Sequence, residues 1–166
     1  MNPCIIYIMG VSGSGKTTVG KKLSERINIP FFDGDDFHTE ANKEKMRTGH
    51  PLTDEDRAGW LTRLNDLAKE QMGKKGAIIG CSALKQKYRK ILSHDLTSHL
   101  FWVFLKGSYQ LIKKRMEKRK GHYMKASMLS SQFKTLEPPA HAITTDIQKT
   151  PDEIVEEIIE KIKDKF

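Results

Sequence analysis

The sequence predicts an α/β fold in which a five-stranded parallel sheet carries helices on both faces. Five short apolar segments alternate with segments of helical periodicity along the 166 residues, as expected of parallel strands joined by helical crossovers. The apolar segments are hydrophobic at consecutive positions, which is typical of strands buried on both faces. A glycine-rich motif also joins the first apolar segment to the first helical one.

The strands are expected where apolar runs end in glycine or acidic residues. The first run, residues 5–9, ends at Gly10, and the second is followed by Asp33-Gly34-Asp35-Asp36. Runs of this length and composition favour buried strands over helices. The five expected strands are residues 5–9, 29–32, 77–81, 100–105 and 141–145.

The helices between these strands are expected from spacing and capping residues. In the first helix, Val19, Leu23 and Ile27 recur on one face. Thr53 and Thr150 can each cap a helix, with an acidic residue three positions later as in a capping box. The expected helices are residues 16–27, 39–48, about 53–72, 85–92, 109–119, about 125–136 and 151–163.

Composition favours one globular domain, residues 1–166. Hydrophobic residues make up 37% of the chain and charged residues 30%. The sequence contains no run of eighteen or more apolar residues, which argues against a membrane span. The N-terminus lacks the features of a secretory signal, so a cytoplasmic location is expected. Cys4 and Cys81 are too few for a disulfide framework or a metal site. The net charge of +8 suits a partner that carries phosphates or carboxylates.

The segment from Gly10 to Thr17 matches the phosphate-binding pattern G-x-x-x-x-G-K-[ST]. Glycines let consecutive backbone N–H groups point at phosphate oxygens, and the helix that follows adds its positive end. Lys16 is expected to reach the β- and γ-phosphates of ATP, and the Thr17 hydroxyl to bind Mg²⁺. The expected ATP-binding residues of this loop are Gly10, Ser12, Gly13, Ser14, Gly15, Lys16, Thr17 and Thr18.

Two aspartates after the second strand are expected at the same rim as this loop, because ligands collect at the carboxyl ends of parallel strands. Asp33 is expected near the water shell of the metal. Asp35 is expected to orient an acceptor hydroxyl and to take its proton. The alternative is that both carboxylates only shape the loop as Asx-turns.

Three further positions could bind the acceptor. His38 could bind a hydroxyl or merely cap local structure. Arg57 could hold an acceptor carboxylate, or form a surface ion pair with Asp54. The small residues around Cys81 and Ser82, at the end of the third strand, could let an acceptor approach the backbone.

Residues 113–125 contain seven Lys or Arg residues and one acid. Arg115 and Arg119 are four apart and would share one helix face. Such a segment, about 113–130, would make a lid that closes over ATP and stabilises charge on the transferring phosphoryl group. The alternatives are a solvated basic face or a nucleic-acid surface. Binding of nucleic acid is not expected, since Tyr123 is the one aromatic residue in this segment and interleaved aromatic residues or a recognisable binding motif would be expected.

Several motifs in order resemble the gluconokinase family. They are Gly10–Thr17, Asp33–His38, Asn42–Met46, Gly49–Arg57, Cys81–Lys85, Arg119–Tyr123 and Ser131–Pro138. The resemblance implies a P-loop kinase three-layer fold and ATP-dependent phosphorylation of D-gluconate to 6-phosphogluconate by a cytoplasmic enzyme, commonly a homodimer. It implies catalytic roles for Lys16, Asp35 and Arg119, with Arg115 and Arg119 facing the phosphates. Implied acceptor contacts are Asp35, His38, Lys45, Arg57, Cys81, Ser82, His122 and Gln132.

Two other classes of function stay open on the sequence. One is a kinase for another small acceptor, such as shikimate or a nucleoside monophosphate. The other is a nucleotide-dependent switch or a basic binding module with little acceptor chemistry. The paired aspartates and a long acceptor-side segment, about residues 37–72, speak against a switch.

Overall fold

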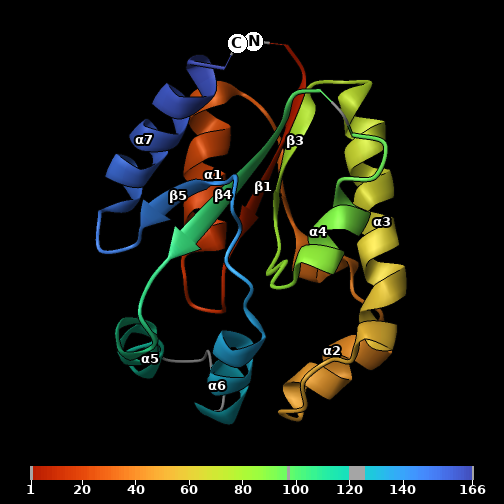
Figure 1. Cartoon of the computed structure of the whole chain (residues 1–166), viewed down its shortest axis with the longest axis vertical. Coiled ribbons are helices and arrows are strands. Elements are labelled where there is room, and N and C mark those ends of the chain that lie inside the picture. Colours follow the sequence, from red (N-terminus) through yellow and green to blue (C-terminus); the bar gives the residue numbers. More distant parts are fainter. Residues whose placement is uncertain (1, 97, 120–125, 166) are drawn as a thin grey trace.

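The five expected strands form one parallel sheet in the computed structural model (Figure 1). The structure describes residues 2–96, 98–119 and 126–165. The strands lie in the order β2-β3-β1-β4-β5, so β1 is central. Their bounds are β1 Cys4–Met9, β2 Phe31–Asp33, β3 Gly76–Gly80, β4 Leu100–Lys106 and β5 Ile143–Asp146.

Strand boundaries differ from the sequence-based expectation at β2 and β5. The strand β2 begins at Phe31, which pairs with Ile78, and not at residue 29. Pro30, just before it, has no N–H to donate to a sheet. The strand β5 begins at Ile143, opposite Val103. Asp33 is therefore the last residue of β2 rather than the first residue after it.

Helices connect successive strands as expected, and most bounds agree to within two residues. Thr53 caps α3 in a complete capping box with Asp56, and the Thr150 hydroxyl accepts from the backbone N–H of Glu153 at α7. A short 3₁₀ helix, η1 Gly34–Phe37, follows β2. The α-helices are α1 Lys16–Ile27, α2 Glu40–Arg47, α3 Asp54–Met72, α4 Gln86–Leu92, α5 Tyr109–Glu117, α6 Ala126–Thr135 and α7 Pro151–Lys163.

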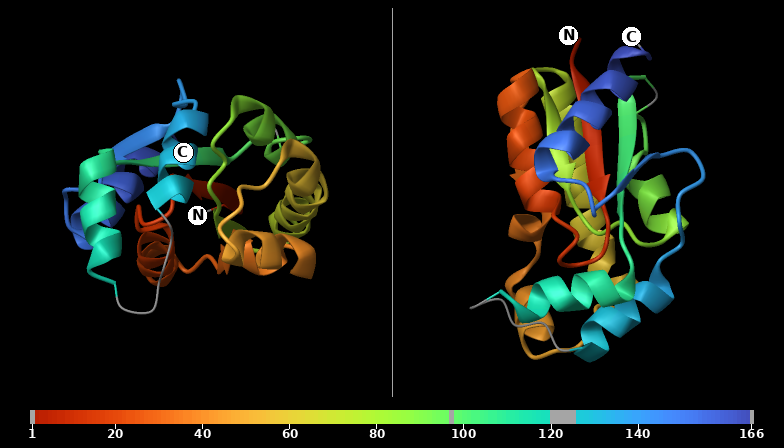
Figure 2. Two further views of the ribbon diagram at one scale, coloured as in Figure 1. Left: turned by 90° about the horizontal axis from the view of Figure 1, so that it is seen from below. Right: turned by 90° about the vertical axis from the view of Figure 1, so that its left-hand side faces the viewer.

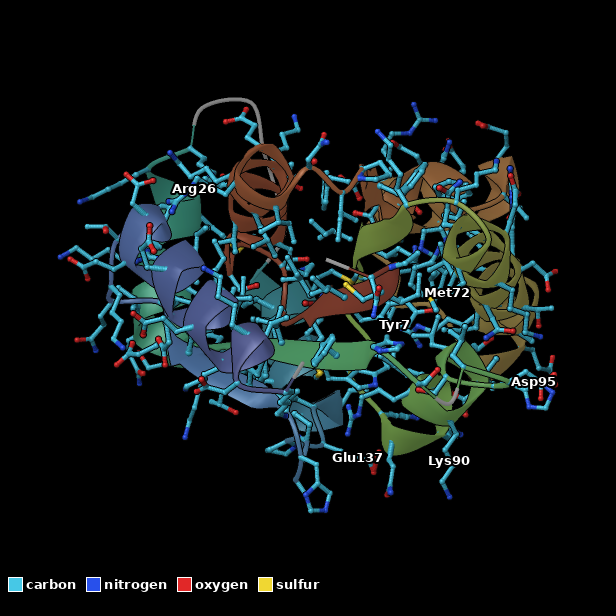
Figure 3. The ribbon with its side chains drawn as sticks, turned by 90° about the horizontal axis from the view of Figure 1, so that it is seen from above. Tyr7, Arg26, Met72, Lys90, Asp95 and Glu137 are labelled. Carbon is cyan, nitrogen blue, oxygen red and sulfur yellow. The ribbon has the colours of Figure 1, made fainter. Side chains whose placement is uncertain are left out.

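The sheet separates two hydrophobic layers, because successive side chains of a strand point to opposite faces. In β1, Ile6 packs in the layer beneath α1 and α7, whereas Tyr7 packs in the layer beneath α3 and α4. Figure 1 shows these two helix pairs on either side of the sheet. In Figure 3 the labelled Tyr7 lies well inside the molecule, while Lys90 and Asp95 lie at its margin.

Three helices gather beyond the carboxyl ends of the strands. Figure 2 shows α2, α5 and α6 at this end, and both termini lie at the opposite end of the sheet. A rim of loops and short helices at this place is where open parallel sheets bind ligands. Within the part of the chain that the structure describes, no helix is long and apolar enough to cross a membrane.

Candidate active site

The phosphate-binding loop connects β1 to α1 at this rim. Gly13 and Gly15 have φ angles of 79° and 99°, a left-handed region that favours glycine. A Cβ atom on Gly13 would lie 2.9 Å from the Met116 side chain. Because Gly15 caps α1 without a side chain, the first amides of the helix can face a phosphate.

Lys16 folds back along this loop. Its Nζ donates to the carbonyl oxygens of Gly10 and Val11, each at 3.0 Å. Burial lowers the pKa of Lys16, while the nearby Asp35 carboxylate acts in the opposite direction. The ammonium is partly buried and its hydrogen bonds go to two neutral carbonyls, so the site favours an added anion beside it.

Asp33 links the expected metal position to the acceptor side. Its Oδ2 accepts from the Thr17 hydroxyl at 3.3 Å, and its Oδ1 accepts from the backbone N–H of Asp35 at 3.0 Å. The second bond is the Asx-turn that the sequence offered as an alternative role. One carboxylate thus both shapes η1 and lies against the hydroxyl expected to bind Mg²⁺.

Asp35 lies in η1, and its side chain is 77% exposed. It faces a cleft between the phosphate-binding loop and α3, described below as the acceptor cavity. Desolvation by the cleft walls nevertheless raises the pKa of Asp35, and the neighbouring Asp33 and Asp36 carboxylates act in the same direction. Lys16 opposes this shift. The Trp60 indole N–H donates to the Gly34 carbonyl at 2.8 Å, which fixes the turn that carries Asp35.

His38 is buried, with 3% of its side chain exposed. Its ring stacks on Trp60 at a centroid distance of 4.0 Å, and its Nδ1 lies 3.5 Å from the Asn42 amide nitrogen. Burial, together with Arg57 and Lys43, lowers the pKa of His38 to about 4. The imidazole is therefore neutral near pH 7, and its Nε2 lies 3.9 Å from Asp35 Oδ1.

This burial predicts that acid destabilises the protein through His38. In the unfolded chain the pKa of the histidine side chain is 6.5. Between pH 6.5 and about pH 4 the unfolded state therefore binds a proton at His38, whereas the native state does not. The contribution of neutral His38 to the free energy of unfolding is complete above pH 6.5. The free energy of unfolding then falls by up to about 3 kcal/mol as the pH drops through this window. Urea unfolding at several pH values should show a shallower decline for His38→Phe than for the wild type.

His94→Gln provides the matched control, because His94 is an exposed histidine with 71% of its side chain accessible. This variant should keep the wild-type pH dependence. Equal slopes for His38→Phe and the wild type between pH 6.5 and pH 4 would contradict the burial argument.

A cavity of about 460 Å³ opens beside Asp35 and reaches from the phosphate-binding loop to α2, α3 and α6. Its volume suits a small molecule. The lining residues are Ser12, Lys16, Asp35, His38, Met46, Arg47, Gly49, Pro51, Leu52, Thr53, Asp54, Arg57, Trp60, Ser82, Leu84, Lys85, Met128, Ser131, Gln132 and Thr135. We call it the acceptor cavity.

Two recesses continue from this cavity along the loop. The phosphate recess shares Ser12, Lys16 and Asp35 with the acceptor cavity and adds Gly13, Gly15, Thr17, Thr18, Asp33, Gly80, Met116 and Arg119. The next recess lies over α1 and α7. Its lining includes Val19, Pro151 and Ile154, beside Arg115 and Arg119. The three hollows form one path, with Lys16 and Asp35 at the first junction.

Arg57 lines the acceptor cavity and does not form the ion pair with Asp54 that the sequence left open as an alternative. Its Nη1 donates to the Leu52 carbonyl at 2.6 Å and to the Tyr88 hydroxyl at 3.1 Å. Asp54, the partner considered from the sequence, instead binds Lys85, Lys87 and the Tyr88 hydroxyl.

Gln132 comes from α6 and contacts the phosphate-binding loop. Its Oε1 accepts from the Ser12 backbone N–H at 2.7 Å, and its Nε2 donates to the Ser12 hydroxyl at 3.1 Å. Gln132 and Ser12 therefore join the wall of the acceptor cavity to the loop.

Three expected site residues lie outside the linings of the acceptor cavity and the phosphate recess. Cys81 is 1% exposed and packs in the core beneath the cavity, whereas its neighbour Ser82 lines the wall. Lys45 forms an ion pair with Asp56 at 2.6 Å. Arg115 donates to the Ile147 carbonyl in the recess over α7, away from the phosphate recess. His122 lies outside the described residues.

Sequence reasoning missed two parts of the site. One is the recess formed by Ile147, Pro151 and Ile154, which follow β5. The other is Met46 with Arg47 on α2 and Met128 on α6. The recess after β5 could have been expected only from the strand order, because that order brings the end of β5 toward the phosphate-binding loop.

A phosphate recess that shares a lysine and an aspartate with an adjoining cavity of small-molecule size defines the class of P-loop kinases for small molecules. The family model for shikimate kinase matches residues 12–163. A shikimate kinase structure from Aquifex aeolicus has a TM-score of 0.60 at 20% identity, over 97% of each chain, a likeness that shows the fold alone.

Closer relatives narrow the class. A probable gluconokinase of Dictyostelium discoideum is 42% identical, over 96% of this chain and 86% of the relative. The thermoresistant gluconokinase of Escherichia coli is 41% identical, over 96% and 93%. A gluconokinase crystal structure from Sinorhizobium meliloti has a TM-score of 0.88 at 38% identity, over 97% and 92%. The chain belongs to the gluconokinase family.

Proposed function

We propose that this protein transfers the γ-phosphoryl group of ATP to the primary hydroxyl of D-gluconate and releases 6-phospho-D-gluconate and ADP. The observation that carries the proposal is the shared position of Lys16 and Asp35, which line both the phosphate recess and the acceptor cavity. Relatives named as gluconokinases match nearly the whole chain, which supports gluconate as the acceptor.

Asp35 is the proposed catalytic carboxylate. The acceptor oxygen forms its bond to the γ-phosphorus while the bond from that phosphorus to the leaving oxygen of ADP breaks. The proton of the hydroxyl passes to Asp35, whose side chain is open to the cavity. Lys16 and the amides at the start of α1 offset the charge that develops on the transferred group.

Thr17 and Asp33 fit a magnesium ion that arrives with ATP. Both offer oxygen ligands, which Mg²⁺ prefers, and their side chains lie 3.3 Å apart in the phosphate recess. The ion would offset the charge of the phosphates. Thr17 would bind it directly and Asp33 through a water molecule.

Several of the other lining residues are each assigned to one of the two substrates, gluconate or ATP. Arg57 is proposed to bind the carboxylate of gluconate, while the neutral His38, Ser82 and Gln132 offer hydrogen bonds to its hydroxyls. Arg119, which lines both nucleotide recesses, is proposed to face the phosphates. The recess over α7 would then accept the base, with Arg115 at its edge.

We also propose that residues 1–166 act as one domain, with residues 37–72 forming the acceptor side. The lid about residues 113–130 stays a prediction, because residues 120–125 lie outside the described chain. The homodimer, the cytoplasmic location and the lack of nucleic-acid binding also stay predictions.

ADP release by purified protein with Mg-ATP tests the proposed reaction. The acceptors to compare are gluconate, its epimers, shikimate, glucose and nucleoside monophosphates. Release with gluconate well above all others is expected. Release with another acceptor alone would keep the kinase class and overturn gluconate as the substrate, and ATP binding without any release would favour a nucleotide-dependent binding protein.

A further inference from the structure

A charged cluster in the wall of the acceptor cavity lies outside the lining of the phosphate recess. We define the acceptor-wall cluster as Arg57, Asp54, Lys85, Lys87 and Tyr88. Arg57, Asp54 and Lys85 line the cavity. Tyr88 is buried behind them, 3% exposed, and Lys87 is on the outer side with 56% of its side chain exposed.

The Tyr88 hydroxyl orders this cluster. It donates its one proton to Asp54 and accepts from Arg57 Nη1 at 3.1 Å. Because Asp54 takes the proton, the hydroxyl presents a lone pair to Arg57. The guanidinium also lies over the Tyr88 ring, 5.2 Å from its centroid, in a cation–π contact. These contacts hold Arg57 in one orientation.

In that orientation the Nη2 and Nε donors of the Arg57 guanidinium stay available for a ligand. Nη1 is used twice, by the Leu52 carbonyl and the Tyr88 hydroxyl. Among the described residues, no protein acceptor binds Nη2 or Nε of Arg57. Two donors on one edge of a guanidinium match the two oxygens of a carboxylate.

Charge in the cluster also favours a second anion. Lys85 Nζ lies 3.3 Å from Asp54 Oδ1, and Lys87 binds the other oxygen of Asp54. Lys85 and Lys87 thus pair with one carboxylate, while Arg57 binds the Tyr88 hydroxyl instead, so the cluster keeps an excess of positive charge. Hydrogen bonds from Lys87 and Tyr88 lower the pKa of Asp54, so this carboxylate keeps its charge near neutral pH.

The backbone that carries Lys85 is held on both sides. The Arg89 guanidinium donates to the Ala83 carbonyl at 2.7 Å and to the Glu137 carbonyl at 2.8 Å. The Glu137 backbone N–H donates to the Leu84 carbonyl at 2.7 Å. A side chain that leaves a fixed loop can recognise a ligand at one position in space.

We propose that Lys85 is a second cation for the acceptor's carboxylate, and that Tyr88 and Asp54 are a positioning pair that aims Arg57 at the same group. The inference rests on the proposed function and deepens it. The cluster would select polyols that end in a carboxylate over neutral polyols of equal length, and would place the far hydroxyl near Asp35.

Steady-state kinetics with D-gluconate and the uncharged D-gluconamide test this selectivity. Lys85→Met and Tyr88→Phe should each raise the KM for gluconate by about tenfold, the effect of one charged hydrogen bond. Values of kcat and the KM for ATP should change by less than about twofold. Because gluconamide lacks the charge, the preference for gluconate over gluconamide in kcat/KM should shrink by about tenfold.

Tyr7→Phe is the matched control. The Tyr7 hydroxyl donates to the carbonyl of Leu92, at the end of the helix that contains Tyr88, at 2.8 Å, and it lies away from the cavity lining. This variant should keep the wild-type preference. If Tyr88→Phe does not fold, Lys85→Met decides alone, since 32% of the Lys85 side chain is exposed.

An unchanged preference in an active Lys85→Met variant would overturn the role of Lys85, and an unchanged preference in a folded Tyr88→Phe variant would overturn the positioning pair. An equal rise of KM for both acceptors would also overturn the inference, since it would indicate general damage to the wall. A wild-type protein inactive on gluconate would overturn the proposed function as well.

Discussion

Replacing Lys16 by alanine is expected to lower kcat by about 10³-fold or more. The Lys16 ammonium lies at the junction of the phosphate recess and the acceptor cavity, where the transferred phosphoryl group would pass. It is partly enclosed by the loop, and within the described part of the chain its hydrogen bonds go to the carbonyl oxygens of Gly10 and Val11. An ionic group in such a place stabilises developing charge more than it could in water.

Single-turnover rates and thermal unfolding of Lys16→Ala and Lys22→Ala check this prediction. Lys22 lies on the same helix, α1, but pairs with Asp152 at the surface. Lys22→Ala should keep near-normal turnover. Near-normal turnover in a folded Lys16→Ala variant would contradict the mechanism.

Asp35→Asn is expected to lower kcat by about 10²- to 10⁴-fold, the usual contribution of a positioned general base. An amide is a poor proton acceptor but fills nearly the same space, so the dissociation constant of Mg-ATP should change little. Asp36→Asn is the matched control, because Asp36 is exposed and adjacent in η1. Rapid-quench kinetics and nucleotide titration separate the two effects.

The pH profile gives a second readout of Asp35. The protonated carboxyl cannot accept the hydroxyl proton, so kcat/KM should fall as the pH drops through the pKa of Asp35, which the cleft raises above its ordinary value. The residual activity of Asp35→Asn should lack this acidic limb. Loss of ATP binding in this variant would instead assign Asp35 to the metal or to the loop structure.

The sequence predicts the fold well because each strand is buried on both faces. In β1, Ile6 and Tyr7 belong to different hydrophobic layers, so the apolar run is continuous and easily recognised. Strand ends are less predictable since they depend on a partner strand. The strand β5 begins at Ile143 because Val103 lies opposite, and nothing near residue 143 encodes that pairing.

Local spacing also predicts the chemical centre of the site. Lys16 and Thr17 follow β1, while Asp33 and Asp35 lie at the end of β2, so a few residues of chain fix their places at one rim. The structure brings Thr17 and Asp33 within hydrogen-bond distance of each other, and their roles beside a metal stay a prediction.

Side-chain orientation and partners from distant segments could not be predicted in this way. Cys81 and Ser82 are adjacent, yet only Ser82 lines the cavity. Lys45 looks available in the sequence, but tertiary packing brings it to Asp56. Likewise Tyr88 reaches Asp54 across 34 positions, a contact that depends on how α4 packs against α3.

Phosphorus NMR of the products most directly tests the claim that this chain phosphorylates gluconate. Purified protein is incubated with Mg-ATP and D-gluconate, with wild type and Lys16→Ala in parallel. We expect the γ-phosphate signal of ATP to be replaced by ADP signals and one phosphate monoester on the primary hydroxyl of gluconate, only with the wild type. Release of inorganic phosphate without a monoester, or a monoester formed equally by Lys16→Ala, would contradict it.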